Sequence, residues 1–418
     1  MNSNNTEFLQ TIINNYYSNS NNNVQTTTLF ILSISTLVFI YYYRKISTKK
    51  KNPLPGQKSP KKSLYDKSKE YQPLKPTPLV DFQWDQVEPI KSYPFKNAEY
   101  KLTMGIRTLD PQDWLLIEPT YKARIETKSK ILNNNHPDYP PTKDLRSSTL
   151  FATPESTPAI KEFYEIVMNY MCDKYPTCFK KQEDEKMIYN LITKKKYPMH
   201  ISSSTIDPYE LQEFLAENIE EDFIILLKDP TRQTEENGNE YFFKAGVFGF
   251  AAGFNPIDRF NTPLSFIHHP IPGYESKLKL SMNRFFNRLS PGQFVTRSNF
   301  SIQTHNKFYV DDSNKGYHNS NDGGDGDSGI LEPMKFEDLD FENQVHYRSE
   351  RQVLTKLPQS GAIVFTIRTY LLPLSQVKNE GKEVCDRLIG AIKGFPKDIA
   401  HYKRSEEWGE AVIQYLSK

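Results

Sequence analysis

Two adjacent histidines lie in the segment of the chain with the clearest chemical potential, FIHHPIPGY at residues 266–274. Because proline fixes its backbone φ near −65°, Pro270 and Pro272 leave this segment little backbone freedom. A metal or haem iron needs an imidazole that is held in this way, and neutral imidazole is the commonest protein ligand for such metals. A haem requires only one histidine on its proximal side. His268 is therefore the leading candidate ligand.

A strand would place His269 on the opposite face from His268, so the two are not expected to bind one metal together. The competing interpretation is structural: one histidine is exposed to solvent and the other is hydrogen-bonded in the core, which is the commoner situation for such a pair. The remaining histidines show no HxxxH or HxH spacing, and the cysteines are too few and too scattered for a structural zinc site or an iron–sulfur cluster. These residues are His136, His200, His305, His318, His346, His401, Cys172, Cys178 and Cys385.

Arginine side chains offer a second kind of chemistry, the binding of carboxylates or phosphates. Arg284 and Arg288 are one turn apart on a predicted helix over residues 275–289, so they share a face. Arg368 stands out because it lies in the middle of an otherwise apolar predicted strand. A charged residue there must be paired, either with an acid such as Glu350 or with an anionic cofactor, and the sequence does not decide between the two.

The spacing of apolar residues predicts the elements that must position these side chains. In the strand that contains Arg368, Phe365 and Ile367 are expected on one face and Arg368 on the other. Glycines within residues 241–254 indicate a bulge or the close approach of another group, such as a flat cofactor. Further helices are predicted over residues 110–132 and 157–175, at Asp207 and around Trp408, and strands over residues 223–227, 241–254 and 362–370. Helices followed by strands predict a mixed α+β fold.

Composition excludes several classes of function. The chain has 418 residues and a net charge of +2 from 53 basic and 51 acidic residues, whereas a nucleic-acid surface needs a clustered basic excess. No Rossmann GxGxxG follows a strand, and there is no P-loop, GxSxG or CxxC motif. With three cysteines and no disulfide framework, a reducing compartment is expected, and any electron-transfer centre must lie on a partner.

The N-terminal part of the chain predicts a membrane anchor. Residues 26–43 carry no charge, end in three tyrosines and are followed by a basic cluster, which is typical of a single transmembrane helix with its following part in the cytosol. The expected organisation is a disordered luminal tail over residues 1–25, this helix, a Lys- and Pro-rich stalk over residues 44–92 and a folded domain over residues 93–418, with a surface insertion at residues 311–329. The endoplasmic reticulum is the default membrane for such a single-pass protein.

Six segments in order make the chain resemble the α-subunit family of haem-dependent oxidative N-demethylases. They are MGIRTLDPQDWLLIEPTYKARI at residues 104–125, EDFIILLKD at 221–229, AGVFGFAAGF at 245–254, PLSFIHHPIPGYESKLKLSMNRFFNRLSPG at 263–292, VTRSNFSI at 295–302 and ERQVLTKLPQSGAIVFTIRTYLLPL at 350–374. The resemblance implies a PAS-like antiparallel sheet with packed helices that holds a b-type haem. In that family an Ile-His-x-Pro motif supplies the iron ligand, which here corresponds to His268. Arg297, Arg351 and Arg368 match family arginines, and the resemblance makes them candidates either for contact with the haem propionates or for structural pairing.

The resemblance also implies an activity and partners. A monooxygenase of this kind uses O₂ and external electrons to oxidise a small N-methyl amine to the demethylated amine and formaldehyde. The electrons would come from a separate redox partner protein, a flavin or iron–sulfur reductase, because this chain encodes neither centre. Two alternatives are a haem-binding PAS-like sensor or carrier, and a catalytically inactive membrane-tethered scaffold.

Overall fold

A computed structural model describes residues 73–182, 186–201, 205–310, 314–315 and 332–418. In this part of the chain, the central element is a seven-stranded antiparallel sheet with the strand order β1-β8-β9-β10-β6-β7-β2. A smaller antiparallel sheet has the order β3-β4-β5. The strands are β1 (Arg107–Thr108), β2 (Leu150–Ala152), β3 (Phe179–Lys181), β4 (Met187–Asn190), β5 (Lys195–Pro198), β6 (Asp222–Lys228), β7 (Tyr241–Val247), β8 (Phe294–Gln303), β9 (His346–Lys356) and β10 (Ile363–Pro373).

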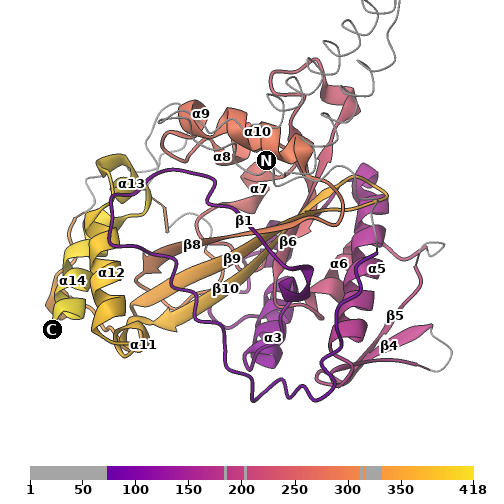
Figure 1. Cartoon of the computed structure of the whole chain (residues 1–418), viewed down its shortest axis with the longest axis horizontal. Coiled ribbons are helices and arrows are strands. Elements are labelled where there is room, and N and C mark those ends of the chain that lie inside the picture. The colour runs from indigo at the N-terminus through magenta and orange to yellow at the C-terminus, as the bar shows by residue number, and fades with distance from the viewer. Residues whose placement is uncertain (1–72, 183–185, 202–204, 311–313, 316–331) are drawn as a thin grey trace, which may run out of the picture. The chain divides into compact units, whose positions relative to one another are not determined.

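One face of the seven-stranded sheet packs against helices α3 (Tyr121–Leu132), α5 (Thr157–Lys174) and α6 (Pro208–Ala216) (Figure 1). Helix α5 confirms the helix predicted over residues 157–175, and its apolar stripe is buried. Pro158 lies in its first turn, where a backbone N–H would have no partner within the helix, so the proline costs no hydrogen bond. The start of α6 confirms the prediction at Asp207, whose carboxylate accepts a hydrogen bond from the Tyr209 N–H at 2.7 Å.

The other face of the sheet packs against the α8–α10 layer, which we define as α8 (Leu264–His268), α9 (Tyr274–Lys277) and α10 (Lys279–Arg288) (Figure 1). A third apolar cluster joins the ends of β8 and β9 to the C-terminal helices. The remaining α-helices of the described residues are α4 (Leu145–Thr149), α7 (Pro256–Arg259), α11 (Leu374–Lys378), α12 (Lys382–Lys393), α13 (Lys397–Tyr402) and α14 (Ser405–Ser417). The sheet therefore lies between two helical layers.

Strands β9 and β10 form a long hairpin that supplies residues to both faces. Its turn contains Gly361 at φ 67°, a conformation that glycine adopts without steric penalty, and the Glu162 carboxylate accepts hydrogen bonds from the backbone N–H groups of Gln359 and Ser360. Phe365 lies on the face of the α8–α10 layer, whereas Arg368 lies on the face of α3 and α5. The alternation predicted for this strand is confirmed.

Three predicted elements end or begin elsewhere than expected. The helix predicted over residues 110–132 begins only at Tyr121, because the preceding backbone carbonyls accept hydrogen bonds from arginines of the sheet. The helix predicted over residues 275–289 is divided into α9 and α10 at Leu278. Strand β7 ends at Val247, short of the predicted end at residue 254. Its Gly246 lets the neighbouring strand β6 approach closely, since a Cβ at this position would lie 2.4 Å from the Phe223 carbonyl oxygen.

The membrane-spanning component of the predicted fold class is wrong. Among the described residues, no helix is both long and apolar enough to cross a membrane. The segment predicted to do so, residues 26–43, lies outside the described residues, as do the tail at 1–25 and most of the insertion at 311–329. The prediction relied on the hydropathy of these residues alone, and none of the helices that the structure describes combines such apolarity with the ~20 residues that a spanning helix needs. The fold of the described residues is mixed α+β with antiparallel sheets.

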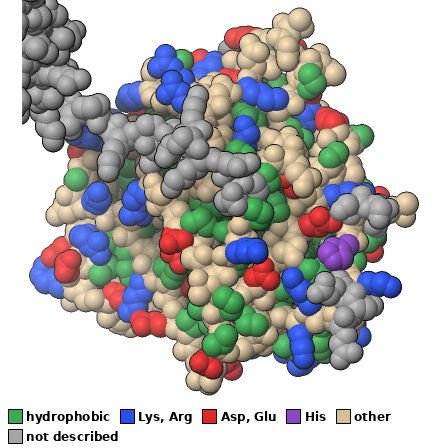
Figure 2. Space-filling view, turned by 45° about the vertical axis from the view of Figure 1, so that its right-hand side comes forward, with side chains coloured by type: hydrophobic (Ala, Val, Ile, Leu, Met, Phe, Trp, Pro, Cys, Tyr) green, Lys and Arg blue, Asp and Glu red, His purple; other side chains and the backbone are tan. Residues whose placement is uncertain are grey.

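Residues 73–92, predicted as the end of the stalk, lie against the domain. The Leu79 N–H donates to the Lys174 carbonyl at 2.8 Å, and the Tyr347 hydroxyl donates to the Ser92 carbonyl at 2.7 Å. On the face that Figure 2 shows, lysines and arginines are interspersed with aspartates and glutamates, in agreement with the balanced composition.

Candidate functional site

Helix α8 positions His268, and the sequence around it explains where this short helix ends. Pro263 precedes its first residue, and the prolines that follow His269 cannot continue the helix. Gly273, at φ 75°, then reverses the chain in a left-handed conformation that other residues rarely adopt. The chain therefore turns back so that Tyr274 lies beside His268.

The His268 imidazole is held in one tautomer. Its Nδ1 is 2.8 Å from the carbonyl oxygen of Leu264, one turn earlier, and because a carbonyl can only accept, Nδ1 is the protonated nitrogen. Burial lowers the pKa of His268 to about 4, so the ring is neutral at physiological pH. The lone pair of Nε2 is then available for a metal, in the arrangement that ligating histidines usually show.

Two further contacts fix the ring and its helix. The Tyr274 ring stacks on the His268 ring, with 5.3 Å between centroids and 19° between planes. The buried Glu240 carboxylate accepts hydrogen bonds from the Ser265 N–H at 2.7 Å and from the Asn283 side chain at 2.8 Å. Glu240 therefore ties α8 to α10.

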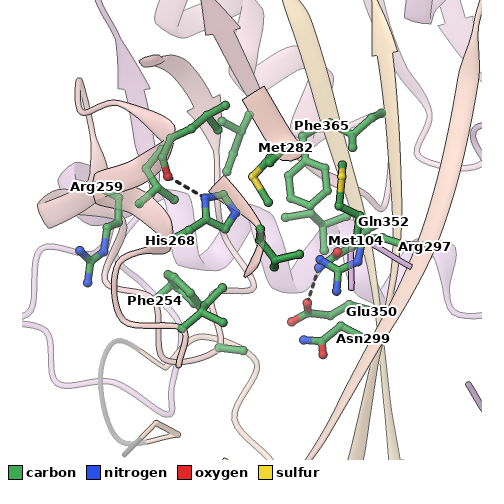
Figure 3. A pocket seen from close by; sticks show the side chains of 18 of the residues that line it. Met104, Phe254, Arg259, His268, Met282, Arg297, Asn299, Glu350, Gln352 and Phe365 are labelled. Carbon is green, nitrogen blue, oxygen red and sulfur yellow. Dashed lines mark hydrogen bonds between the residues drawn. The ribbon is translucent and has the colours of Figure 1, made fainter. Parts of the chain in front are cut away.

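His268 lines a cavity of about 210 Å³ between the α8–α10 layer and the sheet (Figure 3). Most of its wall is apolar. Side chains of β6, β7 and β10 form the floor, and α10 contributes the opposite side; among them are Ile224, Leu226, Phe243, Met282, Phe286 and Phe365.

Across the cavity from His268, the sheet presents polar side chains (Figure 3). Arg297 of β8 pairs in register with Gln352 of β9, and Asn299 pairs with Glu350. The Gln352 side-chain amide donates to Glu350 at 2.9 Å. The Nε atom of Arg297 is buried, and this guanidinium forms no hydrogen bond or ion pair with any residue that the structure describes.

Two buried lysines complete what we call the polar end of the cavity, namely Arg297, Asn299, Lys315, Glu350, Gln352 and Lys403. The Lys403 ammonium donates to the Phe300 carbonyl at 2.7 Å, and within the described parts of the chain neither lysine forms an ion pair with a carboxylate. Glu350 already has a cationic neighbour, since its carboxylate is 3.7 Å from Arg348 Nε. Burial, together with the nearby Lys315 and Arg297, lowers the pKa of Lys403 to about 7, although Glu350 acts in the opposite direction.

The other arginines considered in the sequence lie outside this cavity. Arg368 is on the opposite face of the sheet, where it contacts the carboxylates of Glu118, Glu220 and Glu221 at 2.5 Å, 2.6 Å and 3.3 Å. Arg351 is on that face too and donates to the carbonyls of Trp114, at 3.0 Å, and Asp113. Arg284 and Arg288 are exposed on α10, and His269 is exposed at the end of α8. Of the four predicted site residues, the structure brings together His268 and Arg297.

The sequence reasoning missed Lys315, Lys403 and Gln352 as parts of a site. Lys403 follows α13 in a segment without a recognisable motif, and Lys315 lies inside the predicted insertion. Gln352 offered a signal in its spacing, because in a strand it shares a face with Glu350, and the structure shows that this strand is mostly buried. A buried strand with two polar residues on one face indicates a lined cavity.

One comparison with known proteins decides the family. The model of the family described as haem-dependent oxidative N-demethylase, alpha subunit-like, matches residues 105–413, which is most of the chain. The chain belongs to this family. The match includes every residue of the cavity that the preceding paragraphs place on β6–β10, on the α8–α10 layer and at Lys403.

The family name points to haem, and the cavity has the matching chemistry. A haem is an apolar plate that carries an iron at its centre and carboxylates at one edge. The described residues offer one neutral imidazole with a free Nε2, apolar walls and a positively charged end. No group of three or more His, Cys, Asp or Glu side chains that could hold a metal ion occurs among them.

Proposed function

We propose that this protein is an O₂-dependent oxidative N-demethylase that binds haem b through Nε2 of His268. One observation carries the proposal: in a member of a haem-dependent family, a neutral histidine is anchored through Nδ1 and faces an apolar cavity. Haem, when bound, supplies O₂ activation and the oxidation of an N-methyl carbon. In balance, the amine, O₂, two electrons and two protons give the demethylated amine, formaldehyde and water.

The chain's own residues would bind and orient the amine. Apolar side chains such as Phe243 and Phe365 exclude water and contact the methyl group. The Oε1 atom of Gln352 is buried and has no hydrogen-bond partner among the described residues, so it can accept a hydrogen bond from an amine N–H.

The electrons would come from a separate flavin or iron–sulfur reductase. All three cysteines, Cys172, Cys178 and Cys385, are buried and unpaired, and burial raises the pKa of each thiol. They are also scattered along the chain. These properties suit structural residues and not the ligands of a second redox centre. A redox partner protein is therefore part of the proposal.

The adjacent histidines provide a matched test. We expect full-length His268→Ala, produced with a supply of haem precursor, to lose the haem and its Soret band, because Nε2 is the only protein ligand in the proposal. His269→Ala should keep both, since His269 is exposed. Full haem content in His268→Ala, with loss in His269→Ala, would reject the assignment.

Activity is tested by formaldehyde release. The haem-loaded chain, supplied with NADPH, a reductase, O₂ and a methylated amine, should release formaldehyde in an amount equal to the demethylated amine. A chain that binds haem and O₂ but never releases formaldehyde would be a haem-binding sensor or carrier instead.

A further inference from the structure

The polar end of the cavity contains more positive charge than its own carboxylate can balance. Arg297, Lys315 and Lys403 all face this region, while Glu350 is the one carboxylate that lines it in the described part of the chain. Glu350 is also shared with Arg348. Because buried charges are normally paired, an unbalanced group of cations indicates a missing anionic partner.

The three cations approach one place from separate segments. Arg297 projects from β8, and Lys403 donates to the carbonyl of Phe300 on the same strand. The Lys315 ammonium lies 5.0 Å from the ring centroid of Tyr402, the residue before Lys403. Since a strand, a loop and the end of α13 all contribute a cation here, a solvated basic surface does not explain the arrangement.

We propose that Arg297, Lys315 and Lys403 form the binding site for the two carboxylates of the haem. The inference rests on the proposed function and adds to it the orientation of the ligand in the cavity, with its apolar part near His268 and its acidic edge at the polar end (Figure 3). Arg351 and Arg368 have no part in it, because their guanidinium groups are already hydrogen-bonded on the opposite face of the sheet.

The proposal has a pH signature at Lys403. Without a ligand, burial and the neighbouring Lys315 and Arg297 hold the pKa of Lys403 at about 7, against the influence of Glu350. A bound carboxylate raises that pKa, so the complex keeps a proton that the free protein loses. The affinity for the diacid should therefore be highest below about pH 7, where Lys403 is protonated in the free protein. It should fall as the pH rises above 7, by at most about tenfold per pH unit.

The experiment compares iron protoporphyrin IX with its dimethyl ester, which has the same ring and iron but no anionic carboxylates. Dissociation constants are measured by Soret titration of the full-length chain. Because charged hydrogen bonds contribute a factor of about ten or more each, we expect the wild-type protein to prefer the diacid by at least ~100-fold. Arg297→Gln and Lys403→Met should each reduce this preference about tenfold, and Lys403→Met should remove the fall in affinity above pH 7. Arg297→Lys, which keeps the positive charge, should retain most of the preference for the diacid.

Ester binding serves as the control for folding, since a variant that binds the ester as the wild type does has an intact cavity. Arg351→Gln removes a buried arginine from the other face, and Arg284→Gln removes an exposed one; both should keep the full preference for the diacid. Equal affinity of the wild type for diacid and ester, with both lost in His268→Ala, would overturn the carboxylate site and leave haem ligation standing. Absence of binding of either compound to the wild type would overturn the proposed function as well.

Discussion

At the scale of single residues, the charge state of His268 and its orientation have separate causes. Burial keeps the imidazole neutral, and the Leu264 carbonyl sets which nitrogen carries the proton. Tyr274 covers the ring on one side, and its hydroxyl is buried without a hydrogen-bond partner among the described residues. The phenol therefore acts on His268 through its ring.

This division of roles predicts how two substitutions of Tyr274 differ. Tyr274→Ala should lower the free energy of unfolding by about 3–5 kcal/mol, because it removes a buried aromatic ring. Tyr274→Phe should leave it within ~0.5 kcal/mol of the wild type or raise it, because no hydrogen bond is lost. Chemical denaturation followed by circular dichroism measures both values. A loss of 2 kcal/mol or more in Tyr274→Phe would show that the hydroxyl has a partner.

How far the sequence predicts the site also differs from residue to residue. The prolines around His268 indicate a restrained imidazole. The hydrogen bond from its Nδ1 to the Leu264 carbonyl requires a helix, whereas the sequence was interpreted as a strand at this position. Arg368 was correctly expected to need a partner, and three acids supply it, none of which is Glu350. Lys403 could not be predicted, since it reaches the cavity only through the packing of α13 against β8.

At the scale of elements, Arg368 joins three segments behind the sheet. Its guanidinium group contacts Glu118 before α3 and Glu220 and Glu221 before β6, and it also donates to the Leu116 carbonyl. Only 1% of the residue is exposed. One side chain of β10 therefore holds the loops that lead into α3 and β6.

Substitution of Arg368 should therefore strongly lower the free energy of unfolding. Arg368→Met would leave three buried carboxylates without their shared cation, for which we expect a loss of about 3–5 kcal/mol in the free energy of unfolding. Arg368→Lys should recover only a small part of this lost stability, because a lysine cannot reproduce the planar group of donors of the guanidinium. The exposed Arg288→Met on α10 provides the control and should stay within ~0.5 kcal/mol. A loss below 1 kcal/mol in Arg368→Met would show that the cluster contributes specificity and not stability.

The strongly patterned elements were predictable, and their boundaries were not. The apolar stripe and Pro158 predicted α5, and alternation predicted β10, because both patterns report burial that is local in sequence. The late start of α3 and the division at Leu278 follow from contacts with distant residues, such as the carbonyls that serve Arg351 and Arg368. A single sequence carries no direct signal of such contacts.

At the scale of the whole described structure, the cavity separates the sheet from one of its two helical layers. Its volume, about 210 Å³, is below the ~300–1,000 Å³ of typical sites for larger ligands. If haem binds here as proposed, we expect the α8–α10 layer to move away from the sheet to admit it. The layer of α5 and α6 packs directly on the sheet's other face in the largest apolar cluster. Because this packing is direct, we expect the layer to stay in place when a ligand binds.

This asymmetry predicts where ligand binding alters backbone protection. When haem is added to the full-length chain, amide hydrogen exchange in α8 and α10 should slow by about tenfold or more, because the ligand then bridges this layer and the sheet. Exchange in α5 and α6 should change little. Mass spectrometry of peptic peptides compares the two layers in one experiment, and His268→Ala with the same haem concentration is the control that should show no slowing in α8. Slowing that is concentrated in α5 and α6 would place the ligand on the opposite face of the sheet, near Arg351 and Arg368, and would contradict the site built around His268.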